Sequence, residues 1–433
     1  MVTTSSSNRY KETIRELSDS IVAAQAPIRI LDAIKWDTET RNDFFKNGFK
    51  KQPAIDLSYY ENRPLGYDTH EKYKQFHLIE REITRRLGHF NPVGQIMRRM
   101  CREYSHVIRM LEARGTPEFS MLSEELYGSS TDVFHEGDPN IASLGCIMAE
   151  ALKNIDRSML LLNDEKTIGG EEAIAILQER LNQVFSEPQD SIRVLLSDGI
   201  VADAAAGADY IKLRKEAKFS IRDLRILEVH EGWVHLGTTL NGMRQPVCTF
   251  LSKGPPSSTV TQEGLAILME IITFASFPER LRKLANRIRA VDLAEQGATF
   301  LDVFHFFRDE GFDEEDCYTN AARIFRGSLP TMGPFTKDLS YCKGFVQVYN
   351  FIQLAVRKGM LDRIPLLFCG KTTLDDIRSL SHLVEEGIVL SPKYLPPQIS
   401  DLSALSAWMC YSNFLNQLNL SRIETDYSTI LGS

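Results

Sequence analysis

The segment HEGWVH at positions 230–235 has residue types and a spacing that could bind a metal ion and activate water. Zinc-binding helices of peptidases usually carry the shorter pattern H-E-x-x-H, because histidines four residues apart lie on one helical face. Here His230 and His235 are five residues apart, which turns their rings about 140° away from each other on an ideal helix. A local i→i+5 bulge absorbs the extra residue and restores the common face. The segment therefore predicts either a metal site on a bulged helix or two core histidines on an amphipathic one.

Glu263, in the segment TQEGLA at 261–266, is the candidate for a third ligand. The apolar continuation ILMEIITFA predicts a buried helix, and a glutamate near the start of such a helix is costly unless a partner neutralises it. A catalytic zinc ion takes three protein ligands and keeps one position open for water, so it could be that partner. The alternative is that Glu263 only complements the N-terminus of its helix.

Helical periodicity covers most of the chain and must supply the elements that position these residues. Two runs differ: SIRVLLSDG at 191–199 and YIKLRK at 210–215 are typical of strands, as edge strands of a small sheet. The predicted fold class is therefore α+β, mainly helical with a small β-sheet. The expected helices span residues 9–25, 76–90, 92–114, 139–158, 170–186, 220–240, 261–276, 278–296, 299–311, 313–326, 338–358, 372–387 and 401–420.

The domain organisation follows from the same pattern. Segment 26–76 contains several prolines and is expected to be irregular. The best candidate boundary lies near residue 188, where the strands begin. We expect an N-terminal helical portion, residues 1–187, and a catalytic portion, residues 188–433, within one continuous compact unit.

Composition excludes several classes of protein. The chain has 433 residues, 43% of them hydrophobic and 25% charged, which rules out a disordered or fibrous protein. The net charge of −8 argues against nucleic acid as a partner. No apolar stretch is long enough for a membrane helix, and the N-terminus has no signal-peptide core. Seven dispersed cysteines without a C-x-x-C pair indicate reduced thiols, so the expected location is cytoplasmic.

Four motifs occur in order along the chain and carry a family resemblance: H-E-x-x-x-H at 230–235, QEGLA at 262–266, RIFRG at 323–327 and FTKDLSY at 335–341. With them the chain resembles the QEGLA-motif family over about residues 15–415. That family includes the flavohaemoglobin expression-modulating QEGLA-motif proteins of bacteria and the microtubule-associated tyrosine carboxypeptidases of animals. The animal enzymes carry a long segment before the catalytic region. This chain lacks one, so it looks more like the bacterial branch, and a strongly acidic tubulin-like tail is not the expected substrate.

The resemblance implies a gluzincin-like metallopeptidase core with one catalytic Zn²⁺ ion. The family's zinc ligands fall on His230, His235 and Glu263, and its catalytic glutamate falls on Glu231. Because Glu231 follows a ligand directly, its carboxylate could accept the proton of the activated water and later deliver it to the leaving amine.

Two further roles need side chains from elsewhere in the chain. The oxyanion of the tetrahedral intermediate needs a hydrogen-bond donor, and Lys337 or Tyr341, four residues apart, could supply it. A free C-terminal carboxylate is best bound by a guanidinium, so Arg323 and Arg326 are candidates and Lys337 is a weaker one. Arginines in a last helical turn more commonly complement the helix dipole. Strand 209–215 could pair with extended substrate along the cleft, as edge strands can. Three acidic residues could orient the histidines: Asp223, Glu228 and Glu270.

These observations lead to a functional hypothesis. The chain is expected to be a zinc-dependent carboxypeptidase that binds the C-terminus of a peptide or protein, with tyrosine or another aromatic residue suggested by the resemblance. One alternative is a regulatory binding protein that modulates flavohaemoglobin expression without catalysis. Another is an endopeptidase or aminopeptidase on the same zinc site, although an aminopeptidase would need an acidic anchor for the free amine. The oligomeric state is left open.

Overall fold

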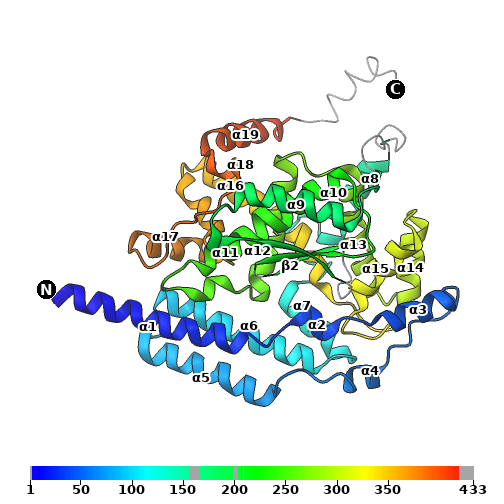
Figure 1. The fold of residues 1–433 in the computed structure, drawn as a ribbon, viewed down its shortest axis with the longest axis horizontal. Coiled ribbons are helices and arrows are strands. Elements are labelled where there is room, and N and C mark those ends of the chain that lie inside the picture. Colours follow the sequence, from blue (N-terminus) through cyan, green and yellow to red (C-terminus); the bar gives the residue numbers. More distant parts are fainter. Residues whose placement is uncertain (1, 154, 156–164, 198–202, 208, 419–433) are drawn as a thin grey trace.

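The computed structural model describes residues 2–153, 155, 165–197, 203–207 and 209–418. Helices dominate this part of the chain, and a three-stranded sheet packs against them (Figure 1). The predicted α+β class, mainly helical with a small sheet, is therefore confirmed. None of the described helices combines the length and apolar character needed to cross a bilayer.

Three N-terminal helices lie side by side along one edge of the molecule (Figure 1). Leu17 and Ile21 of the first helix are buried, as its predicted face requires. Asn91 accepts a hydrogen bond from the Gly94 backbone N–H at 2.9 Å, and Pro92 fits the first helical position, so the third helix begins where Asn91-Pro92 predicted. These helices are α1 (Val2–Gln25), α5 (Thr69–Leu87) and α6 (Pro92–Glu112).

The expectation of an irregular segment over 26–76 is wrong in part. It contains three short helices, and α5 begins at Thr69 rather than at residue 76. Asp37, Asp56 and Asp68 each accept a hydrogen bond from a backbone N–H three residues further on, so local caps start helices that apolar periodicity did not reveal. The three short helices are α2 (Ile30–Ile34), α3 (Thr38–Lys46) and α4 (Leu57–Glu61), and α7 (Pro117–Tyr127) was likewise not predicted.

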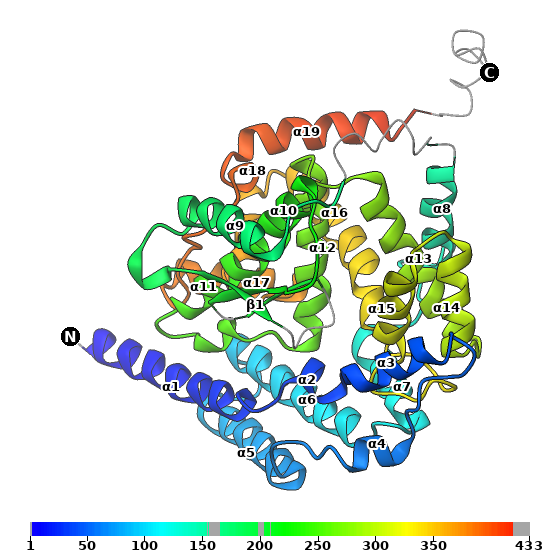
Figure 2. The same ribbon diagram turned by 45° about the vertical axis from the view of Figure 1, so that its right-hand side comes forward.

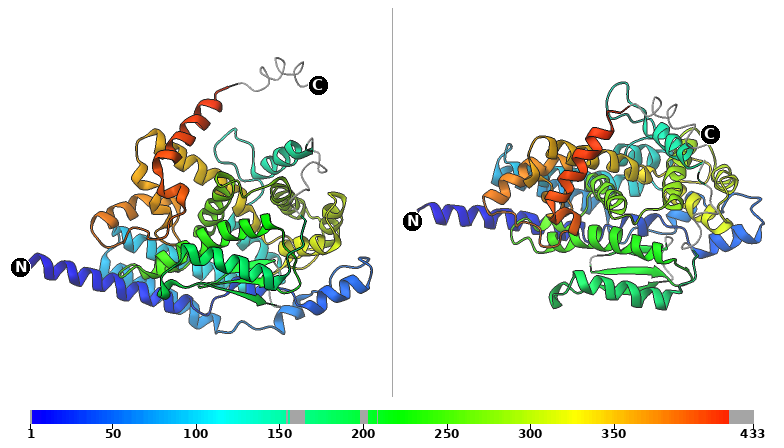
Figure 3. Two further views of the ribbon diagram at one scale, coloured as in Figure 1. Left: turned by 45° about the horizontal axis from the view of Figure 1, so that its top comes forward. Right: turned by 90° about the horizontal axis from the view of Figure 1, so that it is seen from above.

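The sheet contains β1 (Arg193–Ser197), β2 (Ala204–Ala206) and β3 (Tyr210–Arg214) in the order β1-β3-β2. β3 pairs in parallel with β1 and antiparallel with β2. The predicted strands are thus confirmed, but β3 is the central strand and not an edge strand. Both of its edges are already hydrogen-bonded, so it cannot pair with extended substrate as expected. Helix α9 (Gly170–Val184) covers the sheet on the outside of the molecule (Figure 3).

The predicted helix 220–240 is continuous but changes its winding. It comprises α10 (Ile221–Leu227), η4 (Glu228–Leu236) and α11 (Gly237–Met243). η4 is a π-helix, which has i→i+5 hydrogen bonds. Ser220 and Asp223 form a reciprocal capping box, which fixes the start of α10 at Ile221. The predicted bulge is confirmed, and it extends over the whole histidine motif.

Two helices cross in backbone contact at the centre of the molecule. These are α12 (Pro256–Ile272) and α16 (Ser340–Arg357). A Cβ atom at Gly264 would lie 2.1 Å from the carbonyl carbon of Gly344, and one at Gly344 would lie 1.9 Å from the Val260 oxygen. Only glycine fits at either position, which fixes the distance between the two helices.

The remaining helices form two groups around this centre. One group, formed by the helices between residues 278 and 325, lies on the right in Figure 2 and contains much of a second apolar cluster that is rich in phenylalanine. The largest apolar cluster joins residues from both sides of position 188, including Val107 and Leu265; the boundary itself stays a prediction. Parts of three predicted elements (154 and 156–158, 198–199, 419–420) lie outside the described residues. The other elements are α8 (Ile141–Lys153), η3 (Pro188–Asp190), η5 (Thr249–Ser252), α13 (Pro278–Glu295), α14 (Phe300–Asp309), α15 (Glu314–Phe325), η6 (Thr336–Leu339), η7 (Leu361–Arg363), η8 (Pro365–Phe368), η9 (Leu374–Asp376), α17 (Ile377–Glu385), α18 (Pro397–Ser400) and α19 (Leu402–Leu415).

Candidate metal centre and cavity

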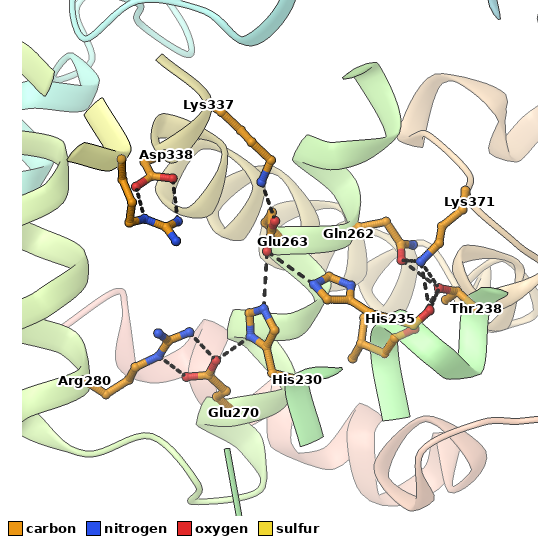
Figure 4. Close-up of polar contacts among 12 residues, drawn as sticks. His230, His235, Thr238, Gln262, Glu263, Glu270, Arg280, Lys337, Asp338 and Lys371 are labelled. Carbon is orange, nitrogen blue, oxygen red and sulfur yellow. Dashed lines mark hydrogen bonds and ion pairs between the residues drawn. The ribbon is translucent and has the colours of Figure 1, made fainter. Parts of the chain in front are cut away.

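The two histidines of η4 point toward one place (Figure 4). The ring centroids of His230 and His235 lie 4.8 Å apart. One ligand atom from each of His230, Glu231 and His235 lies within 4.8 Å of the others. On an α-helix this spacing would turn the rings apart, so the wider turns of η4 are what bring them together.

Glu263 reaches the same place from α12. Its Oε2 atom lies 3.3 Å from His230 Nε2 and 3.4 Å from His235 Nε2. This oxygen is buried and has no hydrogen-bond partner among the described residues. A buried carboxylate oxygen without a partner, facing two imidazole nitrogens, matches the ligand chemistry of zinc, so these three residues could hold Zn²⁺. Glu263 lies well inside α12, beyond its first turn, so the alternative that it only complements a helix N-terminus is wrong.

The second carboxylate oxygen of Glu263 is held by Lys337. Lys337 Nζ donates a hydrogen bond of 2.9 Å to Glu263 Oε1 (Figure 4). Burial disfavours the Glu263 carboxylate, but the ammonium group outweighs burial and holds the pKa of Glu263 well below its ordinary value. The lysine therefore keeps the carboxylate ionised and fixes which oxygen faces the histidines.

Glu270 orients the first histidine from behind. Its Oε1 lies 2.6 Å from His230 Nδ1, and Arg280 donates hydrogen bonds of 3.0 and 2.8 Å to the same carboxylate (Figure 4). Burial opposes ionisation of Glu270, but Arg280 and His230 outweigh it and lower its pKa to about 2. A carboxylate at Nδ1 leaves Nε2 free to face Glu263, as metal-binding histidines require. Asp223 instead caps α10, and Glu228 pairs with arginines.

A cavity of about 490 Å³ opens beside this centre. His230, Glu231 and Tyr341 line it, with apolar side chains such as Phe219 and Phe277. The ring of Tyr341 lies 6.2 Å from that of His230, measured between centroids. The predicted base and one predicted oxyanion donor thus share the cavity with a candidate metal ligand.

The predicted carboxylate-binding residues lie in different places. Arg323 lines the cavity, but it donates hydrogen bonds of 2.9 and 2.8 Å to both oxygens of Asp338. Arg326 is buried over the Phe335 ring, and it is not among the described residues that line the cavity. Lys337 is likewise absent from the cavity wall, since its ammonium group faces Glu263.

Lys371 belongs to the centre although sequence reasoning missed it. Its Nζ donates hydrogen bonds of 2.8 Å to the His235 carbonyl oxygen, 3.1 Å to Thr238 Oγ1 and 3.0 Å to Gln262 Oε1 (Figure 4). Burial lowers the pKa of Lys371 to about 8. The lysine thereby connects η4 with α12. No local pattern around Lys371 could have indicated this, because its partners are more than 100 residues away in the chain.

His230 and Glu231 line the cavity, and His235 and Glu263 lie beside His230. Histidine and glutamate are residue types that hydrolases use to activate water. The family model described as microtubule-associated tyrosine carboxypeptidase matches residues 42–417, and the chain belongs to this family. The resemblance predicted from the four motifs is therefore confirmed, although the match begins at residue 42 rather than near residue 15. The family indicates a carboxypeptidase, a hydrolase of peptide bonds. The comparison with curated proteins finds no match.

Proposed function

We propose that this chain is a zinc-dependent carboxypeptidase that removes a C-terminal residue, with tyrosine or another aromatic residue as the preferred one. The observation that carries the proposal is the buried Oε2 atom of Glu263, which faces Nε2 of both His230 and His235 without a hydrogen-bond partner among the described residues. Family membership supports the peptidase chemistry. The core would then be of the gluzincin type.

His230, His235 and Glu263 would hold the ion. When bound, zinc acts as a Lewis acid and lowers the pKa of a coordinated water to about 7. Glu231 lines the cavity beside His230, where its carboxylate accepts the proton of the attacking water and passes it to the leaving amine. A regulatory binding module has no need of a carboxylate at this position, which favours the enzyme over that alternative.

Tyr341 is the proposed oxyanion donor. Its side chain lines the cavity, whereas Lys337 is engaged with Glu263. A phenol that donates a hydrogen bond to the developing oxyanion stabilises the transition state more than the ground state. The apolar wall formed by Phe219, Ile226 and Phe277 suits an aromatic side chain of the departing residue.

The test combines metal analysis with peptide cleavage. The purified full chain is assayed for zinc and given peptides that end in tyrosine. We expect one zinc per chain and release of free tyrosine. Glu231→Gln is expected to retain zinc and to lose roughly 10²–10⁴-fold in kcat, since it removes the proton acceptor alone. A wild-type chain without stoichiometric metal, or an E231Q variant with normal turnover, would contradict the proposal.

A further inference from the structure

Four arginines line the cavity, and three of them have a carboxylate partner. Arg282 lies 3.5 Å from Glu279, measured from Nη1 to Oε2. Arg280 is bound by Glu270 and Arg323 by Asp338, each through two hydrogen bonds. Arg287, two turns after Arg280 on α13, forms no ion pair with any carboxylate in the described part of the chain. Among the arginines of the described cavity wall, Arg287 is therefore the one whose guanidinium group lacks a carboxylate partner.

The guanidinium group of Arg287 has hydrogen-bond donors that no described residue engages. Its Nε donates a hydrogen bond of 2.9 Å to Asn320 Oδ1, and the two terminal nitrogens have no partner among the described residues. Burial and the nearby charge of Arg323 lower the pKa of Arg287 to about 10. A partly buried cation in this state gains more from a bound anion than a solvated surface arginine does.

The three cations that the sequence suggested for binding a carboxylate are not placed for that role. Arg323 is held by Asp338, and Lys337 is held by Glu263. Arg326 does not belong to the described cavity wall. None of the three residues chosen from the sequence offers a free pair of donors to a molecule in the cavity.

We propose that Arg287 binds the free α-carboxylate of the substrate's C-terminal residue. This inference rests on the proposed function, because the reaction must distinguish a chain end from an internal peptide bond. The terminal nitrogens of a guanidinium can donate two parallel hydrogen bonds to one carboxylate. Asn320 holds the remaining Nε and so fixes the orientation of the fork. A bound carboxylate would give the fourth arginine of the cavity wall an anionic partner, as Glu270, Glu279 and Asp338 do for the other three.

The test compares peptides with a free C-terminus and the same peptides with a C-terminal amide. The wild-type chain is expected to cleave the free form with a kcat/KM roughly tenfold or more above that of the amide, since a charge-assisted hydrogen-bond pair is lost. Arg287→Gln is expected to raise KM for the free form by a similar factor and to bring the ratio toward one, with zinc content unchanged. Arg287→Lys is expected to recover part of the preference, because it keeps the charge but not the fork.

Arg289→Gln is the matched control. Arg289 lies on the same helix, pairs with Glu310 at 2.8 Å, and is not among the described residues of the cavity wall. We expect this variant to keep the wild-type ratio. If R287Q and R287K both keep the wild-type KM for the free form, the role of Arg287 is refuted while the zinc peptidase stands. Should R287Q fail to fold by circular dichroism, an unchanged KM in R287K alone refutes it.

Binding separates the two proposals. Calorimetry with the full chain carrying E231Q measures the affinity for free and amidated peptides without turnover. A preference for the free form that disappears in the E231Q/R287Q double variant supports the role of Arg287, even if the wild-type chain cleaves nothing and the proposed function fails. Equal affinities of the E231Q protein for both peptides would overturn the role of Arg287.

Discussion

His230 is held by a chain of charges that begins at Arg280. The guanidinium of Arg280 stabilises the ionised form of Glu270. The Glu270 carboxylate in turn accepts a hydrogen bond from the Nδ1–H group of the imidazole. Nε2 is then the only ring nitrogen that remains for a metal. Glu270 is fully buried, so its carboxylate is shielded from solvent.

Replacing Glu270 with glutamine tests this arrangement. Glu270→Gln keeps the size of the side chain but removes the charge between Arg280 and His230. We expect zinc affinity to fall about 10–100-fold, measured by competition with a chromogenic chelator. Glu228→Gln is the control, because Glu228 is also buried and arginine-paired but does not contact either histidine. Equal zinc affinity of E270Q and the wild type would contradict the proposed role.

The sequence was informative about residues that share a motif and silent about those that do not. His230, Glu231 and His235 lie within six consecutive residues of one helical segment, so their proximity follows from local winding. Glu263 could be proposed because a carboxylate inside an apolar helix needs a partner. Glu270 could be named only as one of three candidates, and Arg287 could not be named at all. Its importance depends on which other arginines have carboxylates, and pairing between distant helices is not a local property.

At the scale of elements, the crossing of α12 and α16 determines the geometry. Both helices carry a glycine at the point of contact, and both carry residues of the centre: Glu263 on one and Tyr341 on the other. The backbones touch directly, so no side chain can loosen the distance between them. In the QEGLA segment, Gly264 thus has a packing role, and the neighbouring Glu263 has a chemical role.

Gly264→Ala is expected to be strongly destabilising. The added methyl group would overlap the backbone of Gly344, which cannot rotate away, so the free energy of unfolding should fall by about 3 kcal/mol or more. Urea denaturation followed by circular dichroism measures this. At Gly237, a Cβ atom would meet nothing closer than 3.8 Å. Gly237→Ala should therefore leave the stability unchanged or raise it by up to about 1 kcal/mol. Similar unfolding free energies for the two variants would refute the close crossing.

Most helices were predictable because apolar periodicity and caps agree. Helix α6 begins at Asn91-Pro92 as expected, and the predicted bulge over the histidine motif is present. The misses have physical causes. Helices α2, α3 and α4 are too short for a periodic face to be visible. The central place of β3 depends on pairing with two other strands, which a single strand sequence does not encode.

At the scale of the whole molecule, the reactivity of the cysteine thiols measures how well the core excludes solvent. Cys146 and Cys410 are exposed, and the other five cysteines are buried. Burial raises the pKa of Cys342 to about 11 and that of each remaining buried thiol to about 12. Because only the thiolate reacts, the five buried thiols should stay unreactive toward a thiol reagent when the pH is raised from 7 to 9.

Titration with an aromatic disulfide reagent at pH 8 should therefore modify two thiols rapidly in the folded chain. The other five should react only after unfolding in denaturant. The double variant Cys146→Ser/Cys410→Ser should lack the rapid phase. After denaturation, its five remaining thiols should all react. A rapid phase of more than two thiols in the wild-type chain would show that the core is less closed than described.

The two sides of the cavity are built on different principles. On one side, the contact of α12 with α16 and the links from Lys371 and Lys337 hold the metal-facing residues rigidly. On the other side, the wall contains apolar residues such as Phe219 and Phe277. Substitutions there can change which chain end fits without moving a ligand. The architecture is therefore evolvable: new substrate preferences can arise on the apolar wall by single changes, while the chemistry is insulated from them.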